Sequence, residues 1–370
     1  MVKYALILAF SYPRTHSTER INLQYLSSTS HDIQMIYNLC KSFDIEDRSI
    51  TVVTDIVRLP SEVYNCNLKC NPYPSDVFVC REICQFLENT IRGIEELTYK
   101  SDTDYPEVLL YISGHGAHIN IEDNLEQGIV LYSDDGSQLK YLLSKDIFNI
   151  IFGNLPIESD GTMEIPVWGA LKRHKRVETQ SEIRYVPENI GTLIPITVKL
   201  SPTVASPSNS PDMITKPYRS TYLANRGIPL STRMLIIIDT CYSEHMTYFP
   251  YIYDHRSQNM NETSNSNIEV SSILPYCVAI SSCEFDKKTV AKSCGSSLTR
   301  ILYMKILKLK TRLNISQLHY IIYNSNNGII NDLLRTESSH PIITSTHPLS
   351  NLDIPFFSSY TPTVPIKIFK

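Results

Sequence analysis

The chain has 370 residues, of which 42% are hydrophobic and 19% are charged, a composition typical of an ordinary globular protein. Its formal net charge of -4 argues against a general nucleic-acid binder, because such proteins present a strongly basic domain or face. No apolar run approaches the roughly 20 residues that cross a bilayer, so we expect no membrane association. Nine cysteines, an odd number without a recognisable secretory leader, predict a reducing compartment and a cytoplasmic location.

Short apolar runs bounded by polar or turn residues predict the strands of one sheet. In chain order they are 3–10, 49–54, 107–112, 234–238 and 276–281. Between them lie segments with helical periodicity, each beginning near a residue that can cap first-turn amides. These starting residues are Ser30, Ser75, Ser144, Ser296 and Ser316. Buried strands that alternate with helices are typical of a mostly parallel sheet with helices on both faces, so the predicted fold class is α/β.

Two stretches interrupt this pattern. The first, about 156–229, is rich in Pro, Ser and Thr and predicts a long irregular insertion. The second, about 244–269, ends in a run of small polar residues and predicts an exposed linker. They divide the chain into a large part, 1–243, and a small part, 270–370, which we expect to complete the same sheet.

The strand 107–112 leads into Ser113, Gly114, His115 and Gly116, which places a histidine between glycines at the end of a buried strand. Open α/β sheets bind ligands at the carboxyl ends of their strands. The glycines allow a sharp turn and let the amide of Gly116 approach a reacting oxygen. On its own, such a tetrapeptide is more often a turn than an active site.

A second strand, 234–238, leads into Asp239, Thr240 and Cys241, so a nucleophilic side chain also follows an apolar run. A single cysteine in this place is more often a small buried hydrophobic residue. If the two strands are parallel neighbours, however, His115 and Cys241 meet at one edge of the sheet. An imidazole there can withdraw the thiol proton.

The order of these motifs resembles the caspase-like cysteine peptidases and, within them, the metacaspase branch. The match covers about 1–153 and 230–350. The segments that resemble family landmarks are 3–12, 26–32, 51–55, 113–116, 239–243, 281–283 and 295–299. The resemblance implies a caspase-like fold, in which a mostly parallel six-stranded sheet is sandwiched between helices.

In that family a cysteine–histidine dyad cleaves peptide bonds without a metal in the chemical step. Carried over to this sequence, Cys241 is the nucleophile, His115 protonates the leaving amine, and the amides of Cys241 and Gly116 hold the oxyanion. Each such donor typically lowers the barrier by about 3 to 4 kcal/mol. The resemblance therefore implies a cysteine endopeptidase that acts on proteins or peptides and requires no cofactor for its chemistry. We expect a monomer.

Metacaspases line the pocket for the residue before the scissile bond with acidic and hydroxyl groups. Asp32, Ser113 and Asp239 match that pattern. Since two carboxylates pair best with a guanidinium or ammonium group, the resemblance implies cleavage after Arg or Lys. Simpler explanations exist, because Asp32 also suits a helix start and Asp239 also suits backbone donors at a strand end. Caspases hold an aspartate with arginines, and this sequence has no matching arginines.

The sequence departs from the family after the nucleophile, where Tyr242, Ser243 and Glu244 replace the usual His and Ser-Gly. This predicts a less glycine-like turn and a carboxylate that would raise the pKa of Cys241 if it faced the site. A catalytically weak caspase-like scaffold that binds partners through 156–229 is therefore the alternative to an active peptidase. A nucleotide hydrolase would fit the α/β pattern, but the sequence has no P-loop.

Many metacaspases bind calcium through aspartates outside the active site. Asp134, Asp135 and Asp146 lie in the matching region, but Lys145 stands where an acid is expected, so calcium binding is left open. Zinc is not expected, because the closely spaced cysteine pairs in the first hundred residues lack a two-residue gap and a histidine partner.

Self-processing is a further property of the family. The predicted linker contains Arg256 and the insertion contains the basic run 172–176, both of which suit a peptidase that prefers basic residues. Ordinary solvated charge explains these residues equally well.

Overall fold

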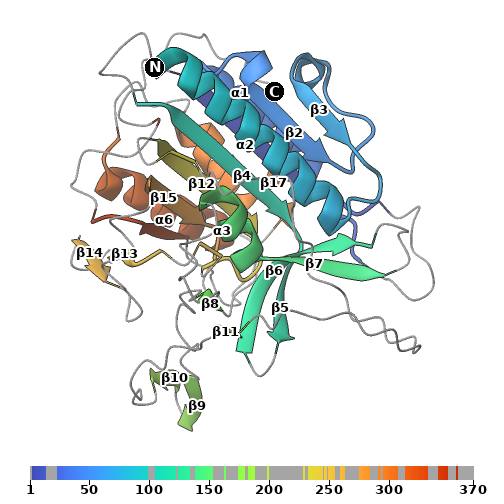
Figure 1. Cartoon of the computed structure of the whole chain (residues 1–370). Helices are drawn as coiled ribbons and strands as arrows, with labels where there is room; N and C mark the ends of the chain where they lie inside the picture. The colour runs from blue at the N-terminus through green and yellow to red at the C-terminus, as the bar shows by residue number, and fades with distance from the viewer. Residues whose placement is uncertain are drawn as a thin grey trace, which may run out of the picture.

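The computed structural model of the chain describes residues 2–13, 23–98, 105–121, 124–133, 138–152, 162–163, 174–179, 182–187, 198–199, 228–229, 232–244, 246–247, 249–254, 259–262, 275–283, 291–292, 295–306, 313–331, 341–348 and 356. A single large sheet lies at the centre of the described part, and helices cover it (Figure 1).

The strands of the central sheet are β1 (Lys3–Ala9), β2 (Ile50–Thr54), β3 (Asn67–Cys70), β4 (Glu107–Gly114), β12 (Arg233–Thr240), β13 (Tyr251–Asp254), β14 (Asn259–Glu262), β15 (Tyr276–Ser281) and β18 (Ile342–Ser345). Their order is β14-β13-β18-β15-β12-β4-β1-β2-β3. Neighbouring strands from β3 to β15 are parallel, whereas β18, β13 and β14 join antiparallel. The predicted α/β class with a mostly parallel sheet is confirmed. Six strands, β18-β15-β12-β4-β1-β2, form the centre of the sheet. The sheet is extended by β3 at one edge and by β13 and β14 at the other.

Shorter strands form small separate sheets. An antiparallel three-stranded sheet follows β4 and consists of β5 (Gly116–Ile121), β6 (Asn124–Tyr132) and β7 (Leu139–Leu143). Three two-stranded pairs are β8 (Thr162–Met163) with β11 (Val198–Lys199), β9 (His174–Thr179) with β10 (Glu182–Pro187), and β16 (Ala291–Lys292) with β17 (Gly295–Ser296). The pairs from β8 to β11 fall within the predicted insertion 156–229, and most of that range lies outside the described residues.

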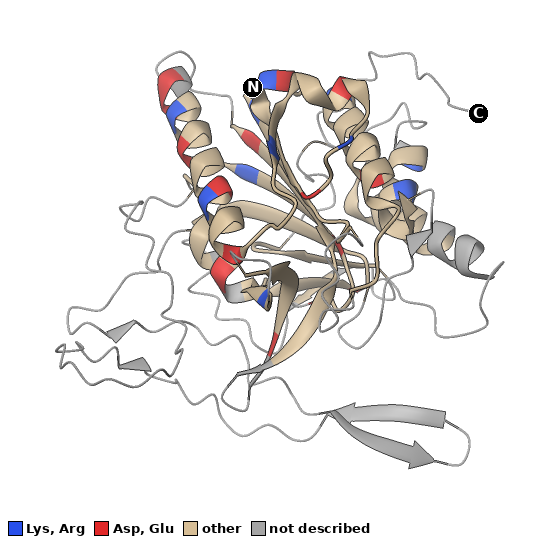
Figure 2. Cartoon of the chain, turned by 90° about the vertical axis from the view of Figure 1, so that its right-hand side faces the viewer, with Lys and Arg blue, Asp and Glu red and all other residues tan. Residues whose placement is uncertain are grey.

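Helices lie on both sides of the central sheet (Figure 2). One side, here called the α1 face, carries α1 (Thr29–Ser42), α5 (Ser297–Ile301), a π-helical turn η4 (Leu302–Ile306) and α6 (Ile315–Asn331). The opposite side, the α2 face, carries α2 (Asp76–Thr98) and α3 (Ser144–Phe152). Two 3-10 turns, η2 (Asp47–Ser49) and η3 (Ser61–Asn65), flank β2 and β3. Of the helices in the described part, none is both long enough and apolar enough to cross a membrane.

The strands divide their side chains between the two faces because successive residues of a strand point in opposite directions. In β4, Leu109 and Tyr111 are buried in the core on the α1 face, whereas Leu110 and Ile112 are buried in the core on the α2 face. Strands that are buried on both faces read as continuous apolar runs, which is why the sequence reveals them. The same alternation places Asp239 of β12 on the α1 face.

The predicted exposed linker 244–269 is wrong in its first half. Met246 and Phe249 are buried in the core on the α2 face, and Tyr251 and Tyr253 are buried in β13, which joins the central sheet. The polar run that suggested a linker begins only after β13, and part of it forms β14. Residues 263–269 of that prediction lie outside the described residues.

Candidate active site

The pairing of β4 with β12 brings the predicted histidine and cysteine together. The two parallel strands are in register up to their ends, where Asp239 lies opposite Ser113 and Thr240 opposite Gly114. His115 and Cys241 are the next residues of the two strands. Just beyond them, a β-carbon built on Gly116 would collide with the carbonyl oxygen of Cys241 and lie 3.0 Å from its carbonyl carbon. Both motifs therefore lie at the carboxyl ends of these two central strands, in direct backbone contact.

The order of the strands in the sheet also reverses between β1 and β4, next to this site. The chain moves from β1 outward to β2 and β3, then returns to β4 on the other side of β1. The loops after β1 and β4 consequently leave toward opposite faces, and ligand sites of open α/β sheets lie at such a point. The loop after β1 supplies Tyr12 and Gln24, which both contact His115.

The ring of His115 has a defined tautomer. Its Nε2 lies 2.7 Å from the carbonyl oxygen of Gln24, and because a carbonyl only accepts, Nε2 carries a proton. In the neutral ring, Nδ1 is then the atom that can accept the proton of a thiol. Burial lowers the pKa of His115 below its ordinary value, while the bond to Gln24 acts in the opposite direction. The neutral, proton-accepting form is therefore favoured near pH 7.

Cys241 is partly buried at the end of β12, and the turn after it has an unusual backbone. Tyr242 has a φ of 59°, in the left-handed region that favours glycine. The sequence predicts a less glycine-like turn here, yet a tyrosine adopts the left-handed conformation. Its ring packs on His118 of β5, with 4.2 Å between ring centroids. Sequence reasoning missed His118, because β5 itself was not predicted.

Behind this turn, hydroxyl and thiol groups join it to the end of β15. The hydroxyl of Ser282 donates to the carbonyl of Thr240 at 2.9 Å, and the hydroxyl of Ser281 donates to the carbonyl of Ser243 at 3.0 Å. The amide of Cys283 donates to the hydroxyl of Ser243 at 3.2 Å. These groups are buried, so the C-terminal part of the chain holds the turn after Cys241 in place.

The predicted pocket acids lie together on the α1 face. Asp32 of α1 and Asp239 of β12 are only 1% and 3% exposed. Asp32 Oδ1 accepts from the amide of Ser296 at 2.8 Å, and the hydroxyl of Ser296 also contacts Asp239 Oδ2. Asp239 Oδ2 further accepts from the amide and hydroxyl of Thr299, at 3.0 and 2.7 Å. Both carboxyl groups thus face the first turn of α5 rather than solvent.

Burial and mutual repulsion set the charge of this acid pair. Burial, with the charge of Asp239 adding to it, raises the pKa of Asp32 to about 7, and hydrogen bonds from Ser296 and Ser28 oppose the rise. Near neutral pH Asp32 therefore keeps part of a proton that an exposed aspartate would have lost.

Ser113, the third predicted pocket residue, is buried at the end of β4 on the same face. It hydrogen-bonds to Tyr111, whose hydroxyl also lies 2.8 Å from the hydroxyl of Thr299. Tyr111 was not predicted, because it reads as part of an ordinary apolar strand. The three residues named from the sequence are therefore gathered in one buried polar cluster, and Tyr111, Ser296 and Thr299 complete it.

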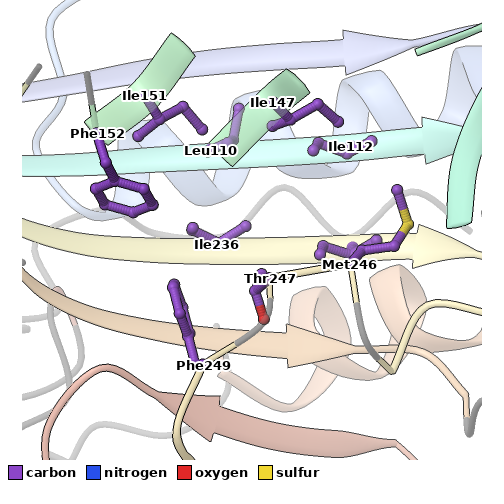
Figure 3. A pocket seen from close by; sticks show the side chains of 10 residues that line it. Leu110, Ile112, Ile147, Ile151, Phe152, Ile236, Met246, Thr247 and Phe249 are labelled. Carbon is purple, nitrogen blue, oxygen red and sulfur yellow. The ribbon is translucent and has the colours of Figure 1, made fainter. Parts of the chain in front are cut away.

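An apolar pocket near the same end of the sheet is separate from this cluster (Figure 3). It is lined by Leu110, Ile112, Ile147, Ile151, Phe152, Ile236, Ile238, Met246, Thr247 and Phe249. These side chains come from β4, β12, α3 and the segment after Cys241, on the α2 face. The sheet therefore separates the pocket from the acids.

The predicted metal ligands are only partly described. Asp134 and Asp135 lie outside the described residues, and Asp146 lies partly buried in the first turn of α3. Within the described ranges, no three His, Cys, Asp or Glu side chains gather as metal ligands. Calcium binding stays a prediction.

Comparison with known proteins gives structural likeness alone. No family model matches the sequence, and no curated protein matches it. One similar solved structure is a Geobacter sulfurreducens protein, with 10% identity, a TM-score of 0.43 and 93% of each chain covered. Another is caspase-1 from Spodoptera frugiperda, with 11% identity, a TM-score of 0.43, and 93% of this chain and 86% of that chain covered.

Proposed function

We propose that the chain is a cysteine endopeptidase in which Cys241 is the nucleophile and His115 the base. The observation that carries the proposal is the register of β4 and β12, which makes these two residues the next pair beyond Thr240 and Gly114. The bond from Nε2 of His115 to Gln24 supports it, because it leaves Nδ1 to take the thiol proton.

The chemical steps follow from these positions. Nδ1 of His115 accepts the thiol proton, and the sulfur of Cys241 attacks the peptide carbonyl to form a tetrahedral intermediate. His115 returns the proton to the departing amine, which leaves an acyl-enzyme. Water, deprotonated by the same imidazole, then hydrolyses the thioester and frees the cysteine.

The oxyanion is assigned to the amides of Gly116 and Cys241. The close approach of these two backbones supports the assignment, since it brings both amides to the same place, and amides aimed at the oxygen of the intermediate stabilise its negative charge. A side chain at position 116 would occupy the space between the two backbones.

We assign the specificity for Arg or Lys to the acid cluster. Asp32, Asp239 and Ser113 lie on the α1 face at the edge of the sheet that carries the proposed dyad. A guanidinium group can replace the present donors, Ser296 and Thr299, only if the first turn of α5 shifts to admit it. Substrate selection therefore includes a local movement of this turn.

Cleavage of short fluorogenic peptides that end in Arg, Lys or Asp tests the proposal. We expect turnover after Arg and Lys, none after Asp, and loss of turnover in Cys241→Ala. Cys70→Ala, at an exposed cysteine of β3, is the matched control and should retain full activity. Each reaction is run with calcium and with chelator, so that undiminished cleavage in chelator removes calcium as a requirement.

The alternative is a catalytically inactive scaffold. It is favoured by Glu244, which lies three residues beyond Cys241 in the nucleophile turn, and by the burial of both pocket acids. A folded wild-type chain that cleaves none of the peptides, in any condition, would support the scaffold and refute the peptidase.

A further inference from the structure

Two hydrogen bonds fix the peptide backbone of His115. Its amide donates to the phenol oxygen of Tyr12 at 3.0 Å, and its carbonyl accepts from the amide of Val130 at 2.9 Å. The hydroxyl of Tyr12 donates in turn to the carbonyl of Val130 at 2.8 Å. A hydroxyl has one proton to donate, so this arrangement assigns the Tyr12 oxygen one donated and one accepted bond. Tyr12 therefore ties His115 to β6.

Tyr12 also contacts the imidazole itself. The two ring centroids are 4.7 Å apart, and the rings are tilted by 35°. A β-carbon built on Gly114 would lie only 2.7 Å from the Tyr12 hydroxyl, so the glycine before His115 leaves room for the phenol. Tyr12 is fully buried, and burial raises its pKa well above the ordinary value, which keeps the hydroxyl protonated.

Tyr12 holds this position in an unfavourable backbone conformation. Its φ is 55°, in the left-handed region that a tyrosine rarely adopts. The buried carboxylate of Asp55 secures it, since Oδ2 accepts from the amide of Tyr12 at 2.7 Å. Oδ1 of the same carboxylate accepts from the amide and hydroxyl of Ser11, at 2.7 and 3.0 Å. A strained residue that several bonds hold in place is a frequent mark of a functional site.

The same anchored segment also supports the second partner of the imidazole. The carbonyl of Ser11 accepts from the amide of Leu26 at 2.8 Å, two residues beyond Gln24. Gln24 supplies the carbonyl that binds Nε2 of His115. Asp55 thus holds the segment that supplies the contacts to both the backbone and the ring of His115.

From this geometry we infer that Tyr12 is a positioning residue for His115, and that Asp55 is its anchor. The inference rests on the proposed function, in which His115 acts on Cys241. Tyr12 neither donates nor accepts a proton in the proposed reaction and works by holding the imidazole at the distance and angle that the thiol requires. A displacement of about 1 Å in such a site can lower the rate about 100-fold.

The test compares Tyr12→Phe with Tyr132→Phe in the full chain. Tyr132 is a buried tyrosine in the same aromatic group, 6.2 Å from Tyr12 between ring centroids, and its loss of a hydroxyl leaves the bond to His115 intact. We expect Tyr12→Phe to lower kcat about 10- to 100-fold with KM nearly unchanged, and Tyr132→Phe to change neither. Equal losses in both variants would overturn the inference, since they would mark a general packing defect.

A second readout does not depend on peptide cleavage. Iodoacetamide alkylation of Cys241 at neutral pH, followed by mass spectrometry, reports how much thiolate the imidazole generates. The rate should fall about tenfold or more in Tyr12→Phe and in His115→Ala, and not in Tyr132→Phe. If the wild type cleaves no peptide but this pattern appears, the positioning role stands and the peptidase function fails. A rate in Tyr12→Phe equal to that of the wild type overturns the positioning role.

Asp55→Asn tests the anchor and also serves if Tyr12→Phe does not fold. It replaces one accepting oxygen with an amide group that cannot bind the Ser11 or Tyr12 donors. We expect slower alkylation in this variant. In the double variant, the further fall caused by Tyr12→Phe should be smaller than the fall that Tyr12→Phe causes alone. Fully additive effects on the alkylation rate would mean that Asp55 does not act through Tyr12, and would refute the anchor.

Discussion

The acidity of His115 determines where on the pH scale the proposed enzyme works. Burial lowers its pKa, so the imidazole stays neutral and able to accept a proton at pH values where an exposed histidine is already charged. The neutral form is present above that pKa and lost below it. The pKa of His115 therefore depends on how far Tyr12 and its neighbours bury the ring.

This predicts the acid limb of the pH profile. The value of kcat reports the enzyme–substrate complex, in which Asp32 is already paired with the substrate, and we expect it to fall with a midpoint below pH 6.5, the ordinary value for histidine. Cleavage of an arginine peptide at saturating concentration, measured from pH 4 to pH 9, gives the midpoint. A limb at or above pH 6.5 would contradict the prediction.

The raised pKa of Asp32 makes the folded chain less stable as the pH rises. Its pKa is raised from 3.8 to about 7, so the folded chain binds more protons than the unfolded chain between these values. Stability from this group is therefore fully present below pH 4 and is lost as the pH rises through 7. We expect Asp32→Asn to remove this loss. Its free energy of unfolding should therefore fall less than that of the wild type between pH 4 and pH 8.

Urea unfolding at the two pH values checks this prediction, and the same variant tests specificity. Because asparagine pairs poorly with a guanidinium group, KM for arginine peptides should rise at least about tenfold in Asp32→Asn. An unchanged pH dependence of unfolding would show that Asp32 is ionised without penalty in the folded chain.

At the scale of elements, the ends of β4 and β12 must lie close together for the site to exist. Gly116→Ala would place a methyl group against the backbone of Cys241, which cannot move aside as a side chain can. We expect a loss of about 100-fold or more in kcat/KM. The control is Gly93→Ala in α2, where the added methyl meets only the flexible tip of Tyr4, and activity should be unchanged. Equal activity of both variants would argue against the backbone contact.

The turn after Cys241 offers a second test at this scale. Tyr242 adopts a left-handed φ of 59° that costs a non-glycine residue about 1 to 2 kcal/mol, and its ring contact with His118 offsets part of that cost. Tyr242→Ala loses the ring and keeps the strain, whereas Tyr242→Gly loses both. We therefore expect the glycine variant to be the more stable by about 1 kcal/mol in urea unfolding. An alanine variant as stable as the glycine variant would mean that the turn relaxes.

At the scale of the molecule, the C-terminal part is an inner component of the fold. β15 lies between β12 and β18, and its residues Cys277 to Ile280 are completely buried. Its end also supplies the hydrogen bonds that hold the turn after Cys241. Residues 1–269 alone would leave β12 as an open apolar edge.

We accordingly predict that a fragment of residues 1–269 does not unfold cooperatively and exposes apolar surface. Co-expression with 270–370 should restore a single sharp transition, measured by circular dichroism and dye binding. A cooperative transition in the fragment alone would show that 1–269 is an independent domain.

The sequence predicts β1, β2, β4, β12 and β15 of the central sheet because their signal is local. Continuous apolar runs mark strands buried on both faces, and the predicted strand 276–281 coincides with β15. The strands β3, β5, β6, β7, β13, β14 and β18 were missed, because short or half-exposed strands owe their form to a partner elsewhere in the chain. The buried half of the predicted linker was missed for the same reason.

The sequence by itself determined the α/β class and the two strand-end motifs that carry His115 and Cys241. Both are written in a few consecutive residues, as apolar periodicity and as glycines around a reactive side chain. Only the tertiary structure decided that Thr240 lies opposite Gly114, that α5 covers the two acids, and that Tyr12 holds the histidine. These contacts join residues far apart in the chain, and the packing of helices on the sheet, rather than any local pattern, brings them together.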